Sequence, residues 1–416
     1  MLREEKFFKD NVLGYIQVKD ELIWNLIQSK EFQRLRRIHQ LGGMYVTFHT
    51  AEHSRFAHSL GVYEIARRMI NEIEGISFSE EERLLTLCAA LLHDLGHGPF
   101  SHAFEGVFHF NHEDYTKRII LENTEVNQLL SDYDPTFPDK IASIIDKKYP
   151  NKIVIQIISS QFDADRLDYL MRDSVNTGVH YGKTDLQRLF RVMRVVEDKV
   201  VVKKSGLREI ENYIISRYHM YHQVYFHPTT RSFEIILTNM LGRFKELVSK
   251  GFTFKHRYDF IMPLLENNIT IDEYLSIDET TVLHYAKLFT TEADELLEEF
   301  ANRLINRRLF KHSSHSAKLE LKLKEAFKKV TPNYEYYVEV DKAKKTGYAK
   351  LRVSTEQLIY VQNRDRIVEL TKASKLVANF ANIKEESTYL FYSKELLQTL
   401  DEREQKMIHE LIRKNY

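Results

Sequence analysis

Apolar residues recur at helical spacing along most of this chain, and few residues interrupt the pattern. The 416 residues include only seven prolines and fourteen glycines, the two residues that most often end a helix. The pattern predicts a mainly α-helical fold. The predicted helical segments are residues 20–40, 55–75, 80–95, 113–131, 139–146, 151–176 and 207–225.

Shorter, alternating segments indicate a small amount of β-structure. The stretch "VVEDKVVVKK" (195–204) alternates around a polar turn and predicts a hairpin. Beyond Lys311, a charged helix leads to four β-like runs and a closing helix at 393–414. We therefore predict a helical core over 1–312 and a smaller α+β module over 313–416, docked on the core and involved in oligomerisation. The four runs are "YEYYVEV", "QLIYVQN", "RIVEL" and "STYLFYS".

Charge and composition argue against several classes of function. Sixty basic residues balance sixty acidic ones, which argues against a primary nucleic-acid partner. The single cysteine, Cys88, lies in the apolar run "LLTLCAALL" and is expected to be a buried thiol. No signal peptide and no uninterrupted apolar span are evident, so we expect a cytoplasmic protein without a membrane partner.

The stretch "LLHDLGHGPFSH" (91–102) concentrates polar chemistry at the end of an apolar helix. Gly96 and Gly98 are expected to end that helix and to leave His93 and Asp94 in its last turn. Buried polar side chains need partners. A divalent metal ion together with a substrate anion would satisfy His93, Asp94, His97 and His102.

Three further stretches supply residues of the same kinds. His58 lies in "HSRFAHSLGV" (53–62), and His112 lies beside Glu113 in "FNHEDY" (110–115). The predicted helix containing "FDADRLDYLMRD" (162–173) places Asp165 and Asp168 on one face, because residues three apart share a face. Tyr169 and Asp173, four apart, share another face.

Taken together, these motifs resemble those of the HD-domain metal-dependent phosphohydrolases. The order of His58, His93-Asp94 and Asp165 is similar to the H…HD…D signature of that superfamily. The stretches 34–62, 91–106 and "DADRLDYLMRD" resemble its deoxynucleoside triphosphate triphosphohydrolase branch, the dGTPase-like enzymes, over roughly residues 5–312. The resemblance implies a helical HD core that hydrolyses dNTPs to deoxynucleoside and inorganic triphosphate.

The resemblance also implies a metal centre and a set of catalytic side chains. The enzyme would contain one or two divalent ions, which could be Mg, Mn, Fe or Zn. One of these ions would be held by His58, His93, Asp94 and Asp165. His102 would donate the proton to the leaving 5′ oxygen, with Glu105 holding its ring, and His112 with Glu113 is the second choice. The family usually has aspartate where Glu105 stands. The histidines expected to line the phosphate path are His97, His102 and His112.

A substrate pocket is implied by a further group of matching positions. Gln40 and Asp173 would bind the 3′ hydroxyl, Leu41 would line the sugar pocket, and the Tyr169 ring would crowd the 2′ position and disfavour ribonucleotides. Tyr225 would lie beside the base. The basic residues matching phosphate-binding positions are Arg55, Arg166 and Arg217.

Effector binding is where this sequence departs from the family. Members that form tetramers bind activating nucleotides between subunits, so the resemblance implies a homo-oligomer, tetramer or dimer, with a nucleotide effector. Gln28, however, replaces the guanine-reading aspartate, and Gln223 and Pro228 replace basic residues. The positions that match the effector clefts are Gln33, Arg36, Arg194, His227, Arg307 and Lys311.

Two alternatives stay open from the sequence. The chain could be another HD phosphohydrolase, such as a nucleotidase or a phosphodiesterase, although Gln40, Tyr169, Asp173 and Arg217 favour a triphosphate substrate. It could also be a non-catalytic nucleotide sensor or a nucleic-acid-binding regulator. A sensor would be expected to have lost a metal ligand, and all four predicted ligands are present.

Overall fold

Three helices form the centre of the fold and position the predicted metal ligands. The computed structural model describes residues 2–265, 269–346, 358–381 and 384–415. Helices α3 (Arg55–Glu72) and α10 (Ala164–Thr177) pack against each other, and α3 also packs against α4 (Glu80–Leu92). All residues of α4 from Leu84 to Leu92 are buried. The prediction of a mainly α-helical fold is confirmed.

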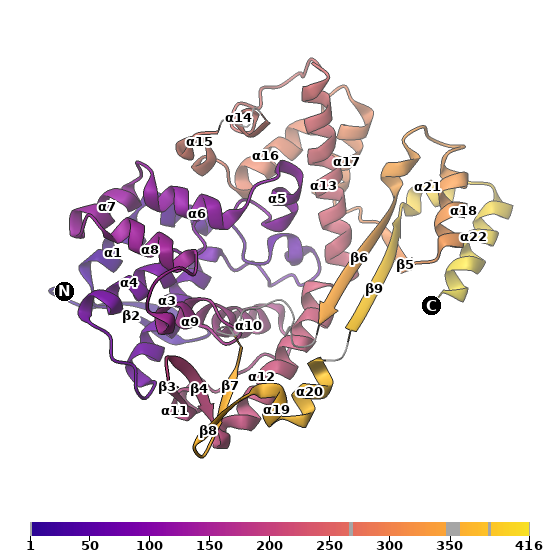
Figure 1. Cartoon of the computed structure of the whole chain (residues 1–416). Coiled ribbons are helices and arrows are strands. Elements are labelled where there is room, and N and C mark those ends of the chain that lie inside the picture. The colour runs from indigo at the N-terminus through magenta and orange to yellow at the C-terminus, as the bar shows by residue number, and fades with distance from the viewer. Residues whose placement is uncertain (1, 266–268, 347–357, 382–383, 416) are drawn as a thin grey trace.

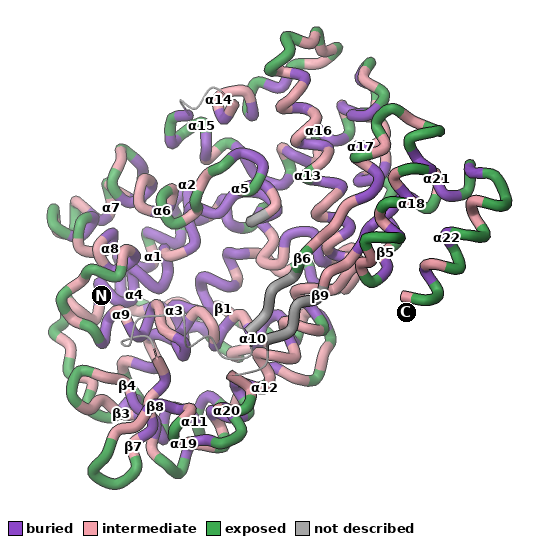
Figure 2. Tube along the Cα trace, turned by 45° about the vertical axis from the view of Figure 1, so that its right-hand side comes forward, coloured by how far each residue is buried: buried purple, intermediate pink, exposed green. Residues whose placement is uncertain are grey.

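Further helices surround this centre (Figure 1). The long helix α13 (Pro228–Ser249) runs beside the core, α17 (Glu295–Ile305) packs against it, and α16 (Glu279–Phe289) packs against α17. Figure 2 shows that buried residues concentrate in the central helices, whereas α22 near the C-terminus is mostly exposed. The further helices described before residue 311 are α1 (Glu21–Gln28), α2 (Lys30–Arg34), α5 (His102–Phe108), α6 (His112–Leu121), α7 (Glu125–Tyr133), α8 (Phe137–Ile145), α9 (Lys152–Ile158), α11 (Leu186–Val192), α12 (Leu207–Met220), α13 (Pro228–Ser249), α14 (Met262–Leu265), α15 (Ile271–Leu275), α16 (Glu279–Phe289) and α17 (Glu295–Ile305).

Several segments predicted as single helices are divided, each at a residue whose side chain caps the next helix. The segment 20–40 breaks at Ser29, which is extended and accepts a hydrogen bond from Phe32 N. Thr124 similarly begins α7 within 113–131, and Asp163 begins α10 within 151–176. A capping side chain replaces the hydrogen bonds that a continuous helix would make, so these breaks have a local cause.

Smaller corrections apply at other boundaries. Helix α4 ends at Leu92, so His93 and Asp94 lie just beyond its last turn rather than in it. The predicted helix 207–225 is α-helical to Met220 and continues as a π-helical turn. The run "YEYYVEV" begins as a 3-10 turn, and its strand starts at Val338. The closing helix 393–414 divides where Asp401 caps α22.

The β-structure joins distant parts of the chain. The predicted hairpin is confirmed as β3 (Met193–Val196) and β4 (Lys199–Lys203), and β7 (Tyr360–Asn363) pairs parallel to β4. Residue 357 of the run "QLIYVQN" lies outside the described residues. The other strands and C-terminal helices are β1 (Lys6–Asp10), β2 (Gly14–Val18), β5 (Lys311–Ser314), β6 (Val338–Thr346), β8 (Arg366–Glu369), β9 (Lys384–Tyr392), α18 (Ala317–Phe327), α19 (Leu370–Ala373), α20 (Lys375–Ala381), α21 (Lys394–Thr399) and α22 (Glu402–Lys414).

The last hundred residues cover the core in two places. Strands β7 and β8 extend the β3–β4 hairpin, whereas β6 and β9 form a second sheet with β5 beside α13 (Figure 1). The Arg231 guanidinium on α13 binds both carboxylate oxygens of Asp341 on β6 at 2.8 Å. The domain boundary near residue 312 stays a prediction. In the part of the chain that the structure describes, no helix combines the length and apolar character needed to cross a membrane.

Glu246 is expected to make the chain acid-sensitive. Hydrogen bonds from Lys250 and Arg243 lower the pKa of this α13 carboxylate to about 2, and Tyr336 also donates to it at 3.1 Å. Because this pKa is depressed, the ionised carboxylate stabilises the fold at pH values above its ordinary pKa of 4.5. This stabilisation is lost as the pH falls towards 2. Because about a third of the side chain is exposed and solvent screens it, we expect Glu246→Gln to cost about 1 kcal/mol at pH 7.

Urea unfolding of the wild type and of Glu246→Gln at several pH values would measure this effect. The difference between the two proteins should shrink between about pH 4.5 and 2. Glu325→Gln is the control, because Glu325 is half exposed and pairs with Lys322 on the same helix. A difference that stays constant down to pH 2 would contradict the assignment.

Candidate metal centre and active site

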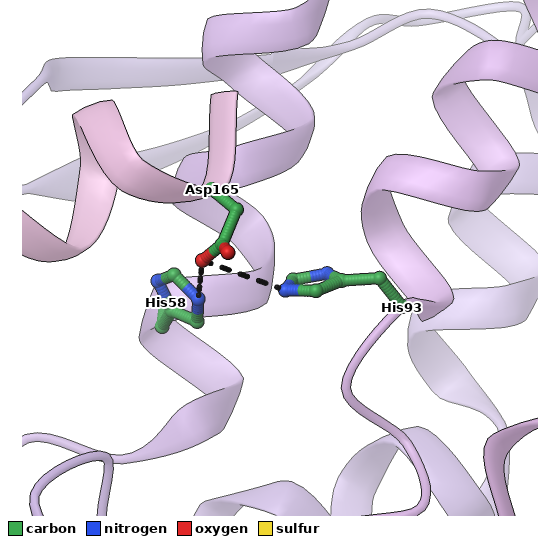
Figure 3. A group of neighbouring side chains, drawn as sticks. All are labelled: His58, His93 and Asp165. Atoms are coloured by element: carbon green, nitrogen blue, oxygen red, sulfur yellow. Dashed lines mark ion pairs between the residues drawn. The ribbon is translucent and has the colours of Figure 1, made fainter. Parts of the chain in front are cut away.

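Side chains from three elements meet at the centre of the fold. His58 comes from α3, His93 follows α4, and Asp165 lies in the first turn of α10 (Figure 3). Their nearest ligand atoms lie within 4.8 Å of one another. Asp165 Oδ1 is 3.2 Å from His58 Nε2 and 3.9 Å from His93 Nε2. Two imidazoles and a carboxylate at this spacing can bind one divalent ion.

The two imidazoles are oriented by their other ring nitrogens. His58 Nδ1 lies 2.8 Å from Asp168 Oδ2, and His93 Nδ1 lies 3.0 Å from the carbonyl oxygen of Ala90. With Nδ1 donating in each case, Nε2 carries the lone pair that a metal requires. Both Nε2 atoms are buried and have no hydrogen-bond partner among the described residues. The donor set therefore fits a metal ion.

Asp94 completes the predicted ligand set and connects it to a basic side chain. Its carboxylate lies 3.2 Å from His93 Nε2 and 3.8 Å from His58 Nε2. Arg55 forms an ion pair with the same carboxylate and also donates to Ser101 Oγ at 2.8 Å. Burial opposes ionisation of Asp94, but the neighbouring His93, His97 and Arg55 hold its pKa well below its usual range. Asp94 is therefore charged and able to bind a cation.

The local electrostatics also favour a cation at this position. Burial alone would lower the pKa of His58, but the neighbouring carboxylates of Asp165 and Asp168 outweigh it and raise that pKa to about 10. The same carboxylates that attract a proton attract a metal ion. Metal binding must displace this proton, so we expect proton release when the ion binds.

A second cluster contains three of the predicted catalytic residues. The ring of His97 stacks on that of His112 at 3.8 Å between centroids, and Glu105 Oε1 lies 2.8 Å from His112 Nδ1. Burial and the charge of Arg55 lower the pKa of His97 to about 3. Burial acts the same way on His112, but Glu105 outweighs it and raises the pKa of His112. The pKa values of the two stacked rings are thus shifted in opposite directions.

The structure does not place two of the predicted catalytic residues, His102 and Glu113, in that cluster. The side chain of His102 lies outside the described residues, so its predicted pairing with Glu105 stays a prediction. Glu113 is exposed and lies 3.6 Å from Lys147, whereas Glu105 contacts His112. The structure therefore does not bring Glu113 to the imidazole that it was predicted to support.

A cavity of about 720 Å³ adjoins the metal centre through Arg55 and Ser101. It is lined by six of the eight residues predicted to bind substrate. Gln40 Oε1 is buried and has no hydrogen-bond partner among the described residues. The six residues are Gln40, Leu41, Arg55, Tyr169, Asp173 and Tyr225.

Asp173 is held in place by two neighbours. His53 Nε2 lies 2.8 Å from one of its carboxylate oxygens, and Tyr225 donates to the other at 2.7 Å. The remaining predicted residues, Arg166 and Arg217, are not among the residues that line the cavity. Arg166 pairs with Asp163, and Arg217 donates to Gln161 Oε1 at 2.8 Å.

The six predicted effector residues are separated in the single chain. Arg36 donates to Gln33 at 2.8 Å, and these two form one pair. Arg307 and His227 form a second group. Arg307 donates to the carbonyl of Val46, and the His227 ring lies near Phe48. Lys311 is the first residue of β5 and is exposed. Arg194 pairs with Glu74 at 3.4 Å.

Sequence reasoning assigned no role to several residues that support the site. His53 and Asp168 lie inside motifs already singled out, so their histidine and carboxylate chemistry was a usable signal. Ser101 is a polar residue in the same motif as His93. Glu279, which accepts a hydrogen bond from the backbone N–H of Phe100, lies in no motif, and nothing in the sequence connects it to a residue 179 positions earlier.

Comparison with known proteins identifies the family. One family model, the HD domain, matches residues 55–173, and another, the HD associated region, matches residues 184–404. An uncharacterized protein of Bacillus subtilis, YwfO, is 47% identical over 95% of this chain and 94% of its own length. The chain belongs to the HD-domain family.

This HD-domain chain is also similar to proteins of described activity. A phosphohydrolase crystal structure from Bacteroides thetaiotaomicron superposes with a TM-score of 0.83 at 27% identity, covering 94% of this chain and 100% of that one. A Dictyostelium discoideum homolog of the deoxynucleoside triphosphate triphosphohydrolase SAMHD1 is 32% identical over 57% of this chain and 49% of its own length. Membership of the HD phosphohydrolase superfamily implies a hydrolase with a divalent metal ion.

Proposed function

We propose that this chain hydrolyses deoxynucleoside triphosphates to deoxynucleoside and inorganic triphosphate. The observation that carries the proposal is the cavity that joins the Asp94–Arg55 pair to Gln40, Tyr169 and Asp173. The cavity is thus lined by hydroxyl-binding groups and, through Arg55, adjoins the candidate metal ligand Asp94. This arrangement fits a sugar with a charged phosphate chain.

The side chains at the phosphate end would bind and protonate the substrate. His58, His93, Asp94 and Asp165 would hold a divalent ion, which would supply a Lewis acid for the α-phosphate and make water more acidic. Arg55 places a positive charge beside this centre. In the reaction, water adds its oxygen to the α-phosphorus, the bond to the 5′ oxygen breaks, and that oxygen takes a proton. His102 and His112 are the candidate proton donors.

Products and isotope positions would test the proposal. Each dNTP, singly and in pairs, is incubated with Mn²⁺ or Mg²⁺, and the products are separated by chromatography. We expect tripolyphosphate and deoxynucleoside, whereas a nucleotidase would release orthophosphate. In water enriched in ¹⁸O, the label should enter the triphosphate and not the nucleoside. Intact dNTPs in all mixtures, with metal and nucleotide still bound, would favour a nucleotide sensor.

Tyr169 is proposed to exclude ribonucleotides. Its ring lines the cavity and its centroid lies 6.2 Å from that of Tyr225. Removing the ring in Tyr169→Ala should admit a 2′ hydroxyl. The preference for dATP over ATP, measured as the ratio of the two kcat/KM values, should then fall by about tenfold or more. Tyr181→Phe, at a tyrosine that does not line the cavity, is the control. An unchanged ratio in Tyr169→Ala would remove Tyr169 from this role.

An effector site and an oligomer are also part of the proposal. Because Gln33, Arg36, Arg194, His227, Arg307 and Lys311 are dispersed in one chain, a nucleotide site made from them would need residues of more than one copy. Sedimentation of the protein with and without each dNTP would test this. We expect nucleotide-dependent assembly into a dimer or tetramer, and a monomer under all conditions would contradict it.

A further inference from the structure

A buried carboxylate outside the HD motif bridges two loops of the candidate site. Glu279 begins α16, and only 4% of its side chain is exposed. Its Oε1 accepts hydrogen bonds from the backbone N–H of His39 at 3.0 Å and of Phe100 at 3.2 Å. Its Oε2 contacts His39 Nδ1. One side chain therefore satisfies donors on two loops that are 61 residues apart in sequence (100 − 39).

Each of these loops carries residues of the candidate site. Gln40 follows His39 directly and places its side chain at the cavity, while its own N–H donates to the carbonyl of His53 at 2.9 Å. Phe100 and Ser101 also line the cavity. Ser101 accepts from Arg55, which is paired with Asp94. Glu279 is thus connected to the sugar side and, through Ser101 and Arg55, to the metal side.

The loop at Phe100 needs such an acceptor. Phe100 and Ser101 have φ values of 53° and 48°, in the left-handed region that non-glycine residues rarely adopt. Two such residues in succession are costly and persist only where the surroundings fix them. The Phe100 N–H is buried, so without Glu279 it would lose its partner. The carboxylate therefore helps to hold the strained turn from which α5 and His102 begin.

We propose that Glu279 is a positioning residue that keeps the Gln40 loop and the Phe100–Ser101 turn at their catalytic spacing. The proposal rests on the proposed dNTP hydrolysis for its kinetic consequence, but not for its structural one. Among the described residues, the hydrogen-bond partners of Glu279 are His39 and Phe100, and neither is a candidate metal ligand. It acts through the backbone of two loops, so its loss should affect both binding and turnover.

Three substitutions at Glu279 separate acceptor geometry from charge. Glu279→Gln keeps an oxygen for the two N–H groups and can turn its NH₂ towards His39. Glu279→Asp keeps the charge, but it is one methylene shorter and cannot reach both loops. Glu279→Ala removes the acceptor. The matched control is Asp278→Asn, because Asp278 caps the same helix and pairs with Arg37 at the start of the first loop, whereas the hydrogen bonds to the backbone of His39 and Phe100 come from Glu279, and asparagine caps equally well.

Amide hydrogen exchange and steady-state kinetics provide two independent measurements. In Glu279→Ala and Glu279→Asp, peptides covering 36–44 and 95–104 should both exchange faster, while the rest of the chain stays protected. In these variants kcat/KM for a dNTP should fall by about tenfold to a hundredfold, with a lower kcat and a higher KM. Glu279→Gln and Asp278→Asn should stay within about threefold of the wild type.

The outcomes decide between positioning and a general structural role. Unchanged exchange in either loop of Glu279→Asp would overturn the proposal, and so would equal losses in Glu279→Asp and Asp278→Asn. If Glu279→Ala does not fold, Glu279→Asp and Glu279→Gln still decide the matter. If the wild type hydrolyses no dNTP, the proposed function fails, whereas the exchange pattern still tests whether Glu279 holds the two loops.

Discussion

Asp94→Ala is expected to abolish metal binding and to reduce dNTP hydrolysis by about 10³-fold or more. The Asp94 carboxylate lies 3.2 Å from His93 Nε2, so its loss removes one of two negative ligands. It also leaves the Arg55 guanidinium, which is only 5% exposed, without its partner. That positive charge would then repel an incoming cation. Metal content by mass spectrometry and triphosphate release by chromatography would measure the two effects.

Two further variants make this experiment specific. Asp94→Asn keeps the size of the side chain and a hydrogen bond to Arg55 but is a much poorer ligand, so it should fold normally and still be inactive. Asp132→Asn, at an exposed carboxylate on α7, should retain metal and activity. If Asp94→Asn binds metal as tightly as the wild type, the assignment of Asp94 as a ligand is wrong.

Asp168→Ala is expected to destabilise the fold by about 3–5 kcal/mol, because it breaks a buried ion pair and removes the charge partner of Arg172 Nε and Nη2, leaving that guanidinium its pairing with Asp10 through Nη1. Asp168 is fully buried and accepts from Arg172 Nε at 2.8 Å and Nη2 at 2.9 Å. The same carboxylate orients His58 through its Nδ1. We therefore expect Asp168→Asn, which keeps the volume, to weaken metal binding by about 10–100-fold. Urea unfolding and calorimetric metal titration would measure these quantities.

Asp10→Asn is the matched control for Asp168. Asp10 binds the same Arg172 at 2.8 Å, from the opposite side, and does not contact His58. Its substitution should lower stability modestly and leave metal affinity unchanged. If Asp168→Asn and Asp10→Asn weaken metal binding equally, Asp168 acts through Arg172 and not by orienting the imidazole.

The helical character of the fold could be predicted from the sequence, but several helix boundaries could not. Apolar periodicity continues through Ser29 and Thr124, because the helices on either side bury the same kind of face. The chain nevertheless turns there, since each hydroxyl caps the following helix. A capping side chain is short and common, so its local signal is weaker than a long periodic pattern. The pairing of β7 with β4 joins residues about 160 apart and has no local signal.

The candidate site shows the same division between local and long-range information. His93 and Asp94 lie in one dense motif, and residue chemistry alone indicated a metal site. Asp168 lies three residues from Asp165, and helical spacing placed the two on one face, as the contacts of both with His58 illustrate. Glu279 reaches the site only because α16 folds back over it. No pattern in a single sequence records such a contact.

The parallel pairing of β4 with β7 has a consequence for how the chain is made. Val201 pairs with Tyr360, so the hairpin that precedes α12 presents an open edge until residues near 360 have left the ribosome. An unpaired strand edge is prone to associate with other chains. We therefore expect nascent chains that end before β7 to depend on chaperones or to aggregate, although their HD segment is already complete. Synthesis, unlike the finished structure, would expose this edge for as long as translation from residue 204 to about residue 360 lasts.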